Sequence, residues 1–558
     1  MSDISTIFVP PDGEDYKGNI LIIGEAPGEE EEKQRKPFVG KSGELLFEVL
    51  ARHGKYRADF KIMNLCGYRP KLNNFSLLEG SIQLKQGLKA IDDYITKLAP
   101  TCILALGAKP LYYLCNRYGI HNNRGSILSY KGIKVIPTFH PSYISRYGQE
   151  YAIFDADIKK FVEELKFPEL NHDEFIIHKD PSAIDIEDWR IEIQKHKIIT
   201  IDIESIKGTS KILCVGFGVS GVESYVIPYS TFSHHAIKEI CENPNIEKVF
   251  HGGGFDCILL GLNDIRVANY CHDTMVAFHV MEIELPKTLD FLTSLYTRTP
   301  YYKGGGRAEI PEDEKGWSER VDKDELWIYN GNDDCATFLV HKKLEREMTE
   351  DERYLYKQEI EMGHLAITIS NNGLPVDEER VELLLSNQLN VWSERQKLLD
   401  IGCNSNDVNV NSPKQMPALL YDKLQLPTRT NDGKVTTDED AIVSLIGYCK
   451  TELEKAKRET TKNTWQYKLT ILKLILEIRG IRKTISTYLR PRLSYDGRLR
   501  SYYKASATNT GRWACQKFLD GTGIQAQTFP RESVEVTETK VEVEELWRKL
   551  QGQEVVND

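Results

Sequence analysis

The sequence predicts an α/β protein with two units of alternating strands and helices, followed by a mainly helical region. Short apolar runs alternate with amphipathic stretches through residues 18–165, as in a parallel sheet covered by helices on both faces. A second α/β unit opens with the apolar run 197–203 and closes near residue 346. From residue 350 onward, long stretches rich in Glu, Lys, Leu and Ile predict helices.

Length and composition limit the class of protein. A chain of 558 residues is too long for one core and should hold three or four domains, at roughly 100–200 residues each. It has no run of about 18 apolar residues, and its N-terminus lacks a secretion signal. Eleven cysteines without a CxxC pair predict free thiols in a reducing compartment. We therefore expect a cytoplasmic protein that has no membrane partner.

The individual elements follow from the same patterns. The first unit should contain strands at 19–23, 60–63, 101–106 and 134–139, with helices at 43–52 and 81–98. A polar connector at 167–182 separates the two units. In the third region, helical patterns at 350–400 and 450–490 flank a turn-rich patch at 404–413 and a small insert near 431–433.

The first unit carries four short motifs. Gly24-Glu25-Ala26-Pro27-Gly28 follows its first strand, and Pro37-Phe38-Val39-Gly40 leads into a helix; Asn64-Leu65-Cys66-Gly67-Tyr68-Arg69-Pro70 and His140-Pro141-Ser142 come later. Over residues 15–165 these motifs resemble the uracil-DNA glycosylase superfamily, most closely its family 4. The resemblance implies a three-layer domain with a parallel sheet and a pocket for a flipped base.

The same resemblance assigns roles to individual residues of that pocket. Glu25 or Glu31 would serve water or cation chemistry, and Phe38 would stack on the base. Asn64 would bind the polar edge of the base, and His140 would face the charge that develops on uracil. No cysteine precedes Cys66, so the family's iron–sulfur cluster is not expected. The alternative is a uracil-sensing or DNA-binding module that does not cut.

Carboxylates with a regular order mark the second unit. Asp202 and Glu204 end an apolar run, and alternation along a strand places both on one face, about 6–7 Å apart. Two adjacent acids repel each other unless a cation lies between them, which suggests a site for a hard metal. Asp256 follows in His251-Gly252-Gly253-Gly254-Phe255-Asp256, and Tyr329 and Asp333 are spaced to share one helix face.

The order DxE, FD and YxxxD resembles the DEDDy 3′–5′ exonucleases over residues 175–346. The resemblance implies an RNase H-like fold and hydrolysis with two Mg²⁺ or Mn²⁺ ions. Asp202, Glu204, Asp256 and Asp333 would hold the metals, and Tyr329 would orient the attacking water. Gly252 replaces an Asn that is usual in the family, and Asp334 should point away from the site.

The third region resembles the linker and thumb of family A (pol I type) DNA polymerases over residues 350–531. The resemblance rests on passages that include Asn372-Gly373-Leu374-Pro375-Val376-Asp377, Asp496-Gly497-Arg498-Leu499 and Thr508-Asn509-Thr510-Gly511-Arg512. It implies contacts of Arg512 and Gln527 with a primer–template. Residues 477–517 hold ten Lys or Arg against two acids, so we expect a phosphate-binding surface that also includes Lys504.

Residues 532–558 carry eight acids against three bases and match nothing in a polymerase palm. We expect a disordered acidic tail, with palm and fingers absent and no polymerase activity from this chain alone. An intron read-through could produce such a tail, and a separate palm-and-fingers polypeptide could complete the enzyme. The layout resembles DNA polymerases of large bacteriophages.

Three hypotheses follow. The first is the proofreading 3′–5′ exonuclease part of a replicative DNA polymerase, which binds single-stranded 3′ ends and primer–template DNA. The second is a uracil-DNA glycosylase or uracil sensor. The third is a catalytically silent DNA-binding scaffold.

Overall fold

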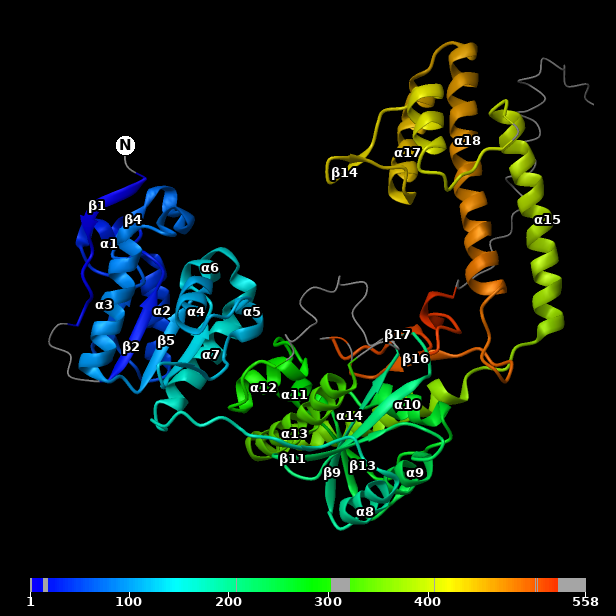
Figure 1. Cartoon of the computed structure of the whole chain (residues 1–558). Helices are drawn as coiled ribbons and strands as arrows, with labels where there is room; N and C mark the ends of the chain where they lie inside the picture. The colour runs from blue at the N-terminus through cyan, green and yellow to red at the C-terminus, as the bar shows by residue number, and fades with distance from the viewer. Residues whose placement is uncertain are drawn as a thin grey trace, which may run out of the picture. The chain divides into compact units, whose positions relative to one another are not determined.

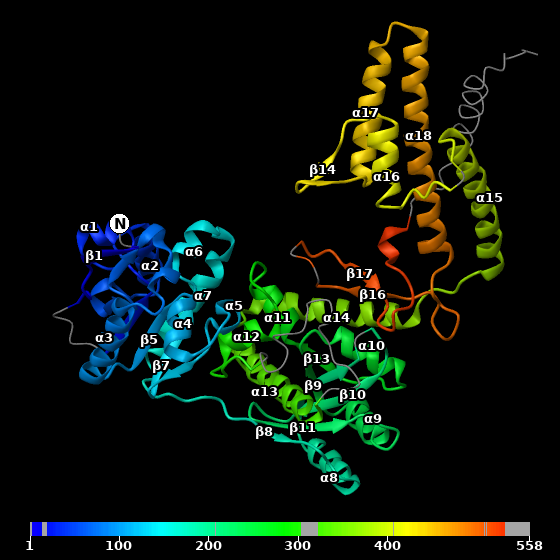
Figure 2. The same cartoon turned by 45° about the horizontal axis from the view of Figure 1, so that its top comes forward.

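The computed structural model describes residues 3–13, 19–206, 208–302, 322–405, 407–506, 508 and 510–529 (Figures 1 and 2). The chain divides into two compact units. Unit 1 comprises Met1–Thr368 with Lys504–Ala514, and unit 2 comprises Ile369–Tyr503 with Cys515–Asp558. The expected acidic tail, residues 532–558, lies outside the described residues. Within the described ranges, no helix is both long and apolar enough to cross a bilayer.

Unit 1 begins with a five-stranded sheet, coloured blue to cyan in Figure 1. Its order is β3-β2-β5-β7-β6, and only β6 runs antiparallel to its neighbour. The strands are β2 (Ile20–Gly24), β3 (Lys61–Asn64), β5 (Cys102–Leu106), β6 (Leu128–Tyr130) and β7 (Ile133–Thr138). The four strands that the apolar runs predict are therefore present, within one or two residues of their expected bounds.

Helices cover both faces of this sheet. One face packs against α3 (Ile82–Leu98) and α4 (Ala108–Cys115), and the other packs against α2 (Lys41–Arg52), α6 (Pro141–Arg146) and α7 (Tyr151–Glu164). The shorter helices are α1 (Glu29–Gln34) and α5 (Ile120–Asn123). A small antiparallel ladder of β1 (Ile4–Phe8) and β4 (Tyr68–Pro70), which the sequence patterns do not predict, closes one side.

The second sheet of unit 1 is six-stranded and mixed, with the order β13-β12-β9-β10-β11-β8. Strands β9, β10 and β11 are antiparallel, whereas β12 and β13 continue the sheet in parallel from β9. The bounds are β8 (Ile176–His178), β9 (Ile198–Ser205), β10 (Ile212–Gly218), β11 (Glu223–Pro228), β12 (Glu247–Phe250) and β13 (Tyr270–Asp273).

One face of this sheet is covered by α8 (Ala183–Ile193), α9 (His234–Glu242) and α10 (Gly254–Leu262), which share an aliphatic core with it. The 25-residue helix α13 (Lys323–Glu347) packs on the other face, along β9, β10 and β11. Helices α11 (Thr274–Met281) and α12 (Leu289–Tyr296) pack beside α13, and α14 (Glu350–Asn372) follows it in the chain.

Unit 2 is mainly helical, as the patterns after residue 350 predict. Helices α15 (Glu378–Gly402), α17 (Glu439–Lys455) and α18 (Glu459–Lys483) pack around a common aliphatic core. The turn-rich patch leads to α16 (Gln415–Pro417) and η6 (Ala418–Lys423). The small insert forms a hairpin of β14 (Thr430–Asn431) and β15 (Lys434–Val435), whose turn residues Asp432 and Gly433 both have positive φ. Beyond η7 (Thr484–Leu489), β16 (Ser501–Lys504) pairs with β17 (Ala514–Lys517), and η8 (Ala526–Thr528) follows.

Candidate active sites

The first candidate site lies between β9 and α13. Strand alternation turns Ile199, Ile201 and Ile203 into the core shared with α8, α9 and α10. Asp202 and Glu204 therefore face α13, on the opposite side of the sheet. Three carboxylates, from Asp202, Glu204 and Asp333, place oxygen atoms within 4.8 Å of one another. The structure thus brings together three of the four acids that the sequence assigns to metal binding.

The fourth acid, Asp256, lies in the first turn of α10 and is 7% exposed. Burial raises its pKa well above the usual range, and the negative charge of Asp202 raises it further. Among the described residues, Asp256 does not belong to the group of three carboxylates within 4.8 Å. Its carboxylate is nevertheless close enough to Asp202 for their charges to interact.

Asp273 fixes the turn that precedes Asp256. Its two carboxylate oxygens accept hydrogen bonds from the backbone N–H groups of Gly252 and Gly253, at 3.0 and 2.9 Å. The same side chain accepts bonds from the backbone N–H groups of Met275 and Val276, and so caps α11. Gly252 has φ of 76°, a conformation that glycine adopts without strain. The sequence motif alone does not reveal this role of Asp273.

Two further polar side chains contact the carboxylates. The amide of Asn330 donates to Asp202 Oδ2 at 2.7 Å and to its backbone oxygen at 3.2 Å. The hydroxyl of Tyr302 donates to Asp333 Oδ1, and its ring lies edge-on to that of Tyr329 with centroids 6.4 Å apart. The sequence motifs identify neither residue as a partner of the carboxylates. The adjacency of Asn330 to Tyr329 in the motif was an available signal, whereas Tyr302 belongs to no motif.

Asp334 points away from this group, as expected. It is fully buried and accepts a hydrogen bond of 2.7 Å from Ser224 Oγ. Burial and the nearby charge of Asp202 raise its pKa well above the usual range. Gly216 leaves space for it, because a Cβ there would lie 2.0 Å from Asp334 Oδ2. Asp334 therefore joins α13 to the sheet and is part of the core.

The donor set at this site fits hard divalent cations. All four predicted ligands are carboxylates, the oxygen donors that Mg²⁺ and Mn²⁺ accept. Four carboxylates near one another, with Asp256 buried, repel strongly without a counter-charge. A bound cation would remove that repulsion, and Asn330 and Tyr302 would hold Asp202 and Asp333 as second partners.

The second candidate site lies at the carboxyl ends of β2 and β3. Gly24 ends β2 between two side chains: a Cβ at this position would lie 2.5 Å from both Asn64 Oδ1 and the Phe38 ring. The Phe38 and His140 rings are 5.9 Å apart between centroids. Gly107 lies between Glu25 and His140, because a Cβ at Gly107 would be 2.7 Å from Glu25 Oε1 and 3.1 Å from His140 Cβ. Four of the five predicted pocket residues therefore lie close together at this site.

His140 is neutral in this environment. Burial lowers its pKa to about 4, and its Nδ1 accepts a hydrogen bond from the backbone N–H of Ser142. The proton of the neutral ring therefore resides on Nε2, which is a hydrogen-bond donor. Burial raises the pKa of Glu25, while the backbone N–H of Lys109 and the charges of Lys109 and Arg146 oppose that effect.

Glu31, the fifth predicted residue, binds backbone groups. Its Oε2 accepts a hydrogen bond from Gly28 N, and its Oε1 accepts one from Phe38 N. Phe38 adopts a left-handed backbone with φ of 52°, which is rare for an aromatic residue. The geometry thus favours Glu31 as the residue that holds Phe38 in place, and leaves Glu25 beside His140.

The basic block at 477–517 is less uniform than its charge count suggests. Arg479 donates to the backbone oxygens of Val410 and Thr437, and burial lowers its pKa. Arg500 is buried and forms an ion pair with Asp496 at 2.6 Å. Arg498 also binds backbone oxygens. Arg479, Arg498 and Arg500 therefore make contacts within the fold, and the expected phosphate-binding surface stays a prediction for the other cations.

The remaining cations of the block divide between the two units. In unit 2, five are exposed: Arg482, Lys483, Arg490, Arg492 and Lys517. In unit 1, Arg512 is exposed, while Lys504 is partly buried, which lowers its pKa. Gln527, in η8 of unit 2, is exposed.

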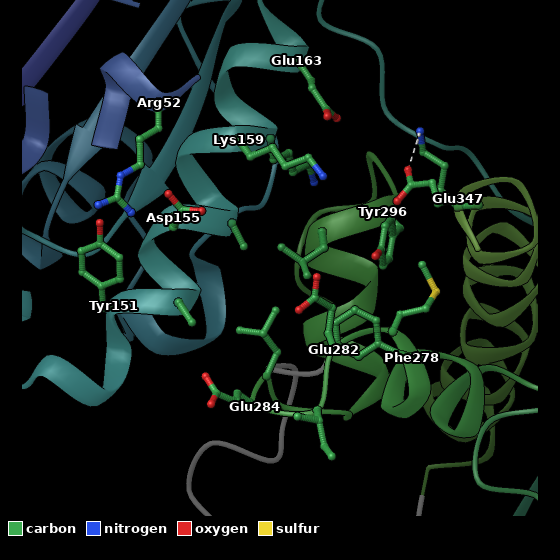
Figure 3. A pocket seen from close by; sticks show the side chains of 18 residues that line it. Arg52, Tyr151, Asp155, Lys159, Glu163, Phe278, Glu282, Glu284, Tyr296 and Glu347 are labelled. Carbon is green, nitrogen blue, oxygen red and sulfur yellow. Dashed lines mark ion pairs between the residues drawn. The ribbon is translucent and has the colours of Figure 1, made fainter. Parts of the chain in front are cut away.

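A cavity of about 610 Å³ in unit 1 coincides with neither candidate site (Figure 3). It is lined by α7 together with parts of α11 and α12, and none of the predicted site residues faces it. Arg52, Asp155 and Lys159 lie on one side of it and Glu282 on the other, as Figure 3 shows. Its mixed charge does not favour one class of charged ligand.

The parts of the chain that carry the two candidate sites each match a known protein family. The model of the uracil DNA glycosylase superfamily matches residues 10–166, and that of a 3′–5′ exonuclease family matches residues 182–349. The type-4 uracil-DNA glycosylase of Thermotoga maritima is 40% identical over 23% of this chain and 66% of that protein. That of Pyrobaculum aerophilum is 33% identical over 27% of this chain and 81% of that protein.

A longer match is the DNA polymerase of Bacillus phage SP01, which is 22% identical over 92% of this chain. The chain spans 63% of the length of that polymerase, which is less than two thirds.

Proposed function

We propose that this chain trims DNA 3′ ends during replication. Over residues 10–166 the chain belongs to the uracil-DNA glycosylase superfamily. Over residues 182–349 it carries the 3′–5′ exonuclease domain of DNA polymerase I-type enzymes. The observation that carries this proposal is the group of carboxylates from Asp202, Glu204 and Asp333 within 4.8 Å. Their two supporting elements, β9 and α13, belong to one sheet-and-helix core, which we propose is RNase H-like.

The geometry suggests a role for each residue in hydrolysis. The four acids would hold two Mg²⁺ or Mn²⁺ ions, which supply an activated water and stabilise the leaving 3′ oxygen. Tyr329, one helical turn before Asp333, would orient the water. Asn330 would fix Asp202, and Tyr302 would fix Asp333. The exposed Arg512 and Gln527, together with Lys504, would bind the primer–template.

Trimming of a 5′-labelled single-stranded oligonucleotide tests the proposal. We expect shortening from the 3′ end that requires Mg²⁺ or Mn²⁺ and stops in EDTA. The double variant Asp202→Ala/Glu204→Ala should lose this activity while keeping its fold, because the change removes metal ligands and also relieves like-charge repulsion. Retention of more than a few per cent of the wild-type rate would place the nuclease site elsewhere.

A second activity is favoured by the convergence of Glu25, Phe38, Asn64 and His140 around Gly24 and Gly107. We propose that this pocket accepts a flipped uracil and that the Nε2–H of His140 donates to the oxygen that gains charge as the base leaves. Cleavage of the glycosidic bond needs no divalent cation. Uracil-containing DNA incubated in EDTA should therefore acquire abasic sites.

Loss of that activity in His140→Ala, with Mg²⁺-dependent trimming unchanged, would assign the two activities to separate sites. Binding of uracil-containing DNA without abasic sites would instead favour a sensing module.

A further inference from the structure

A second group of potential metal ligands lies on the exonuclease domain, outside the carboxylate site. Ligand atoms of His272, His341 and Glu345 lie within 4.8 Å of one another. His272 belongs to β13, whereas His341 and Glu345 are one turn apart near the end of α13. Residues four apart on a helix share a face, so both helical side chains can approach one ion together with His272.

The histidines have the environment of metal ligands. Their ring centroids are 4.5 Å apart, and His341 is only 7% exposed. Burial and the neighbouring His272 lower the pKa of His341 to about 4, which keeps a ring lone pair available at neutral pH. Two imidazole rings and one carboxylate, held this close, can act together as donors.

His272 also has a carboxylate near its other ring nitrogen. Its Nε2 lies 3.5 Å from Glu247 Oε2. Its Nδ1 is buried and has no hydrogen-bond partner among the described residues. A carboxylate on one ring nitrogen orients the ring and leaves the other nitrogen for a metal. The unpartnered Nδ1 is the atom that a bound ion would satisfy.

Glu345 is shared between this group and an arginine. Its Oε2 accepts a hydrogen bond of 3.0 Å from Arg353 Nη1. A carboxylate has two oxygens with several lone pairs, so Glu345 can bind Arg353 and still supply a ligand atom. The arginine holds the carboxylate in position, and its positive charge offsets part of the negative charge there.

We propose that His272, His341 and Glu345 form a site for a transition-metal cation of the Zn²⁺ class, which joins β13 to the end of α13. Imidazole donors select Zn²⁺ and related ions, whereas the carboxylate site selects Mg²⁺ or Mn²⁺. A fourth position would be open to water, as in other sites with three protein ligands. The ion would bind the helix that carries Tyr329 and Asp333 to the strand that ends at Asp273.

The test measures Zn²⁺ binding in the full chain, without an activity assay. Because Zn²⁺ also binds carboxylates, the background is Asp202→Ala/Glu204→Ala, treated with a chelator and then titrated with Zn²⁺ by calorimetry. We expect one equivalent to bind and to raise the thermal midpoint of this variant. A parallel titration with Co²⁺ should give the absorption of nitrogen and oxygen ligation, without the charge-transfer band of a thiolate.

Variants separate this site from others. His341→Ala should abolish the binding, and Glu345→Gln should weaken it at least tenfold. Glu247→Gln should lower the affinity by about 10–100-fold, as loss of a second partner does elsewhere. His235→Ala, an exposed histidine away from the group, should bind like the background.

The proposal would be overturned if the background variant bound no equivalent of Zn²⁺. It would also be overturned if adding His341→Ala or Glu345→Gln left the Zn²⁺ affinity of the background unchanged. If circular dichroism shows that His341→Ala does not fold, the Zn²⁺ affinities of Glu345→Gln and Glu247→Gln test the proposal instead, because both side chains are half-exposed. Since the background lacks nuclease ligands, the result does not depend on whether the chain is an exonuclease.

Discussion

Tyr302 connects a loop to the carboxylate site through one hydrogen bond to Asp333. The Tyr302→Phe variant keeps the ring beside Tyr329 and removes only this donor. We expect the Mg²⁺ concentration for half-maximal trimming to rise by about tenfold or more, because ligand partners of this kind tune metal affinity. The measurement is trimming rate against Mg²⁺ concentration.

Tyr354→Phe, which changes an exposed tyrosine on α14, is the matched control and should behave like the wild type. An unchanged Mg²⁺ requirement in Tyr302→Phe would show that the hydroxyl does not help to hold the metal ligand.

Gly24 separates two walls of the glycosylase-like pocket. A methyl group there would lie 2.5 Å from Asn64 Oδ1 and from the Phe38 ring, so at least one side chain must move. We expect Gly24→Ala to reduce the formation of abasic sites on uracil DNA by at least tenfold, with Mg²⁺-dependent trimming unaffected. Gly148→Ala, whose Cβ meets open space in the same domain, should keep full activity. Equal activities of the two variants would show that the pocket does not bind the base.

His140 makes the stability of its domain depend on pH. Its pKa is about 4 in the folded chain, against an ordinary value of 6.5. Between these values the unfolded chain binds a proton that the folded chain does not, so stability falls as the pH drops from about 6.5 to 4. The loss approaches about 3 kcal/mol, at 1.36 kcal/mol per pH unit.

The measurement is denaturant unfolding of this domain at several pH values. His140→Gln should flatten the dependence between pH 6.5 and 4 relative to the wild type. The same slope in both proteins would mean that His140 titrates normally in the folded chain.

At the level of elements, Asp273 holds the start of α10 and the start of α11 at once. It accepts four backbone hydrogen bonds and is 1% exposed. Asp273→Ala should destabilise this region by about 3 kcal/mol or more, because each buried donor left without a partner costs about 1–3 kcal/mol. Hydrogen exchange of α10 and α11 amides should accelerate accordingly.

Asp438→Ala provides the comparison. Asp438 caps α17 through a single backbone N–H, at an exposed position, so its loss should cost about 1 kcal/mol and affect only α17. Similar small effects of both substitutions would argue against a shared anchor at Asp273.

For the whole chain, binding of primer–template DNA should depend on the cations that remain exposed. Arg512→Ala should weaken binding and lower the slope of log affinity against log salt by about one, as loss of one phosphate contact does. Lys455→Ala removes an exposed cation that pairs with Glu452 at 2.9 Å and should leave the slope unchanged. If the two variants gave the same slope of log affinity against log salt, Arg512 would not contact a phosphate of the bound DNA. Filter binding over a range of salt concentrations gives both values.

Local patterns in the sequence predict much of the fold and part of each site. Alternation places Asp202 and Glu204 on one strand face, and helical spacing places Tyr329 with Asp333. The patterns do not predict Tyr302, because its partner is 31 residues away and only tertiary folding brings them together. A count of charges also does not show which cations make contacts within the fold, as Arg479 and Arg498 do with backbone oxygens.

The continuity of α13 limits how the gene for this chain can change. One helix carries Tyr329, Asn330, Asp333 and Asp334, and then His341 and Glu345. A single inserted or deleted codon between Tyr329 and Asp333 would rotate every later side chain by about 100°, which turns Asp333 away from β9. Substitutions along the outer face of the helix have no such effect. Homologous genes should therefore accumulate insertions and deletions in the surrounding loops while this stretch keeps a constant length.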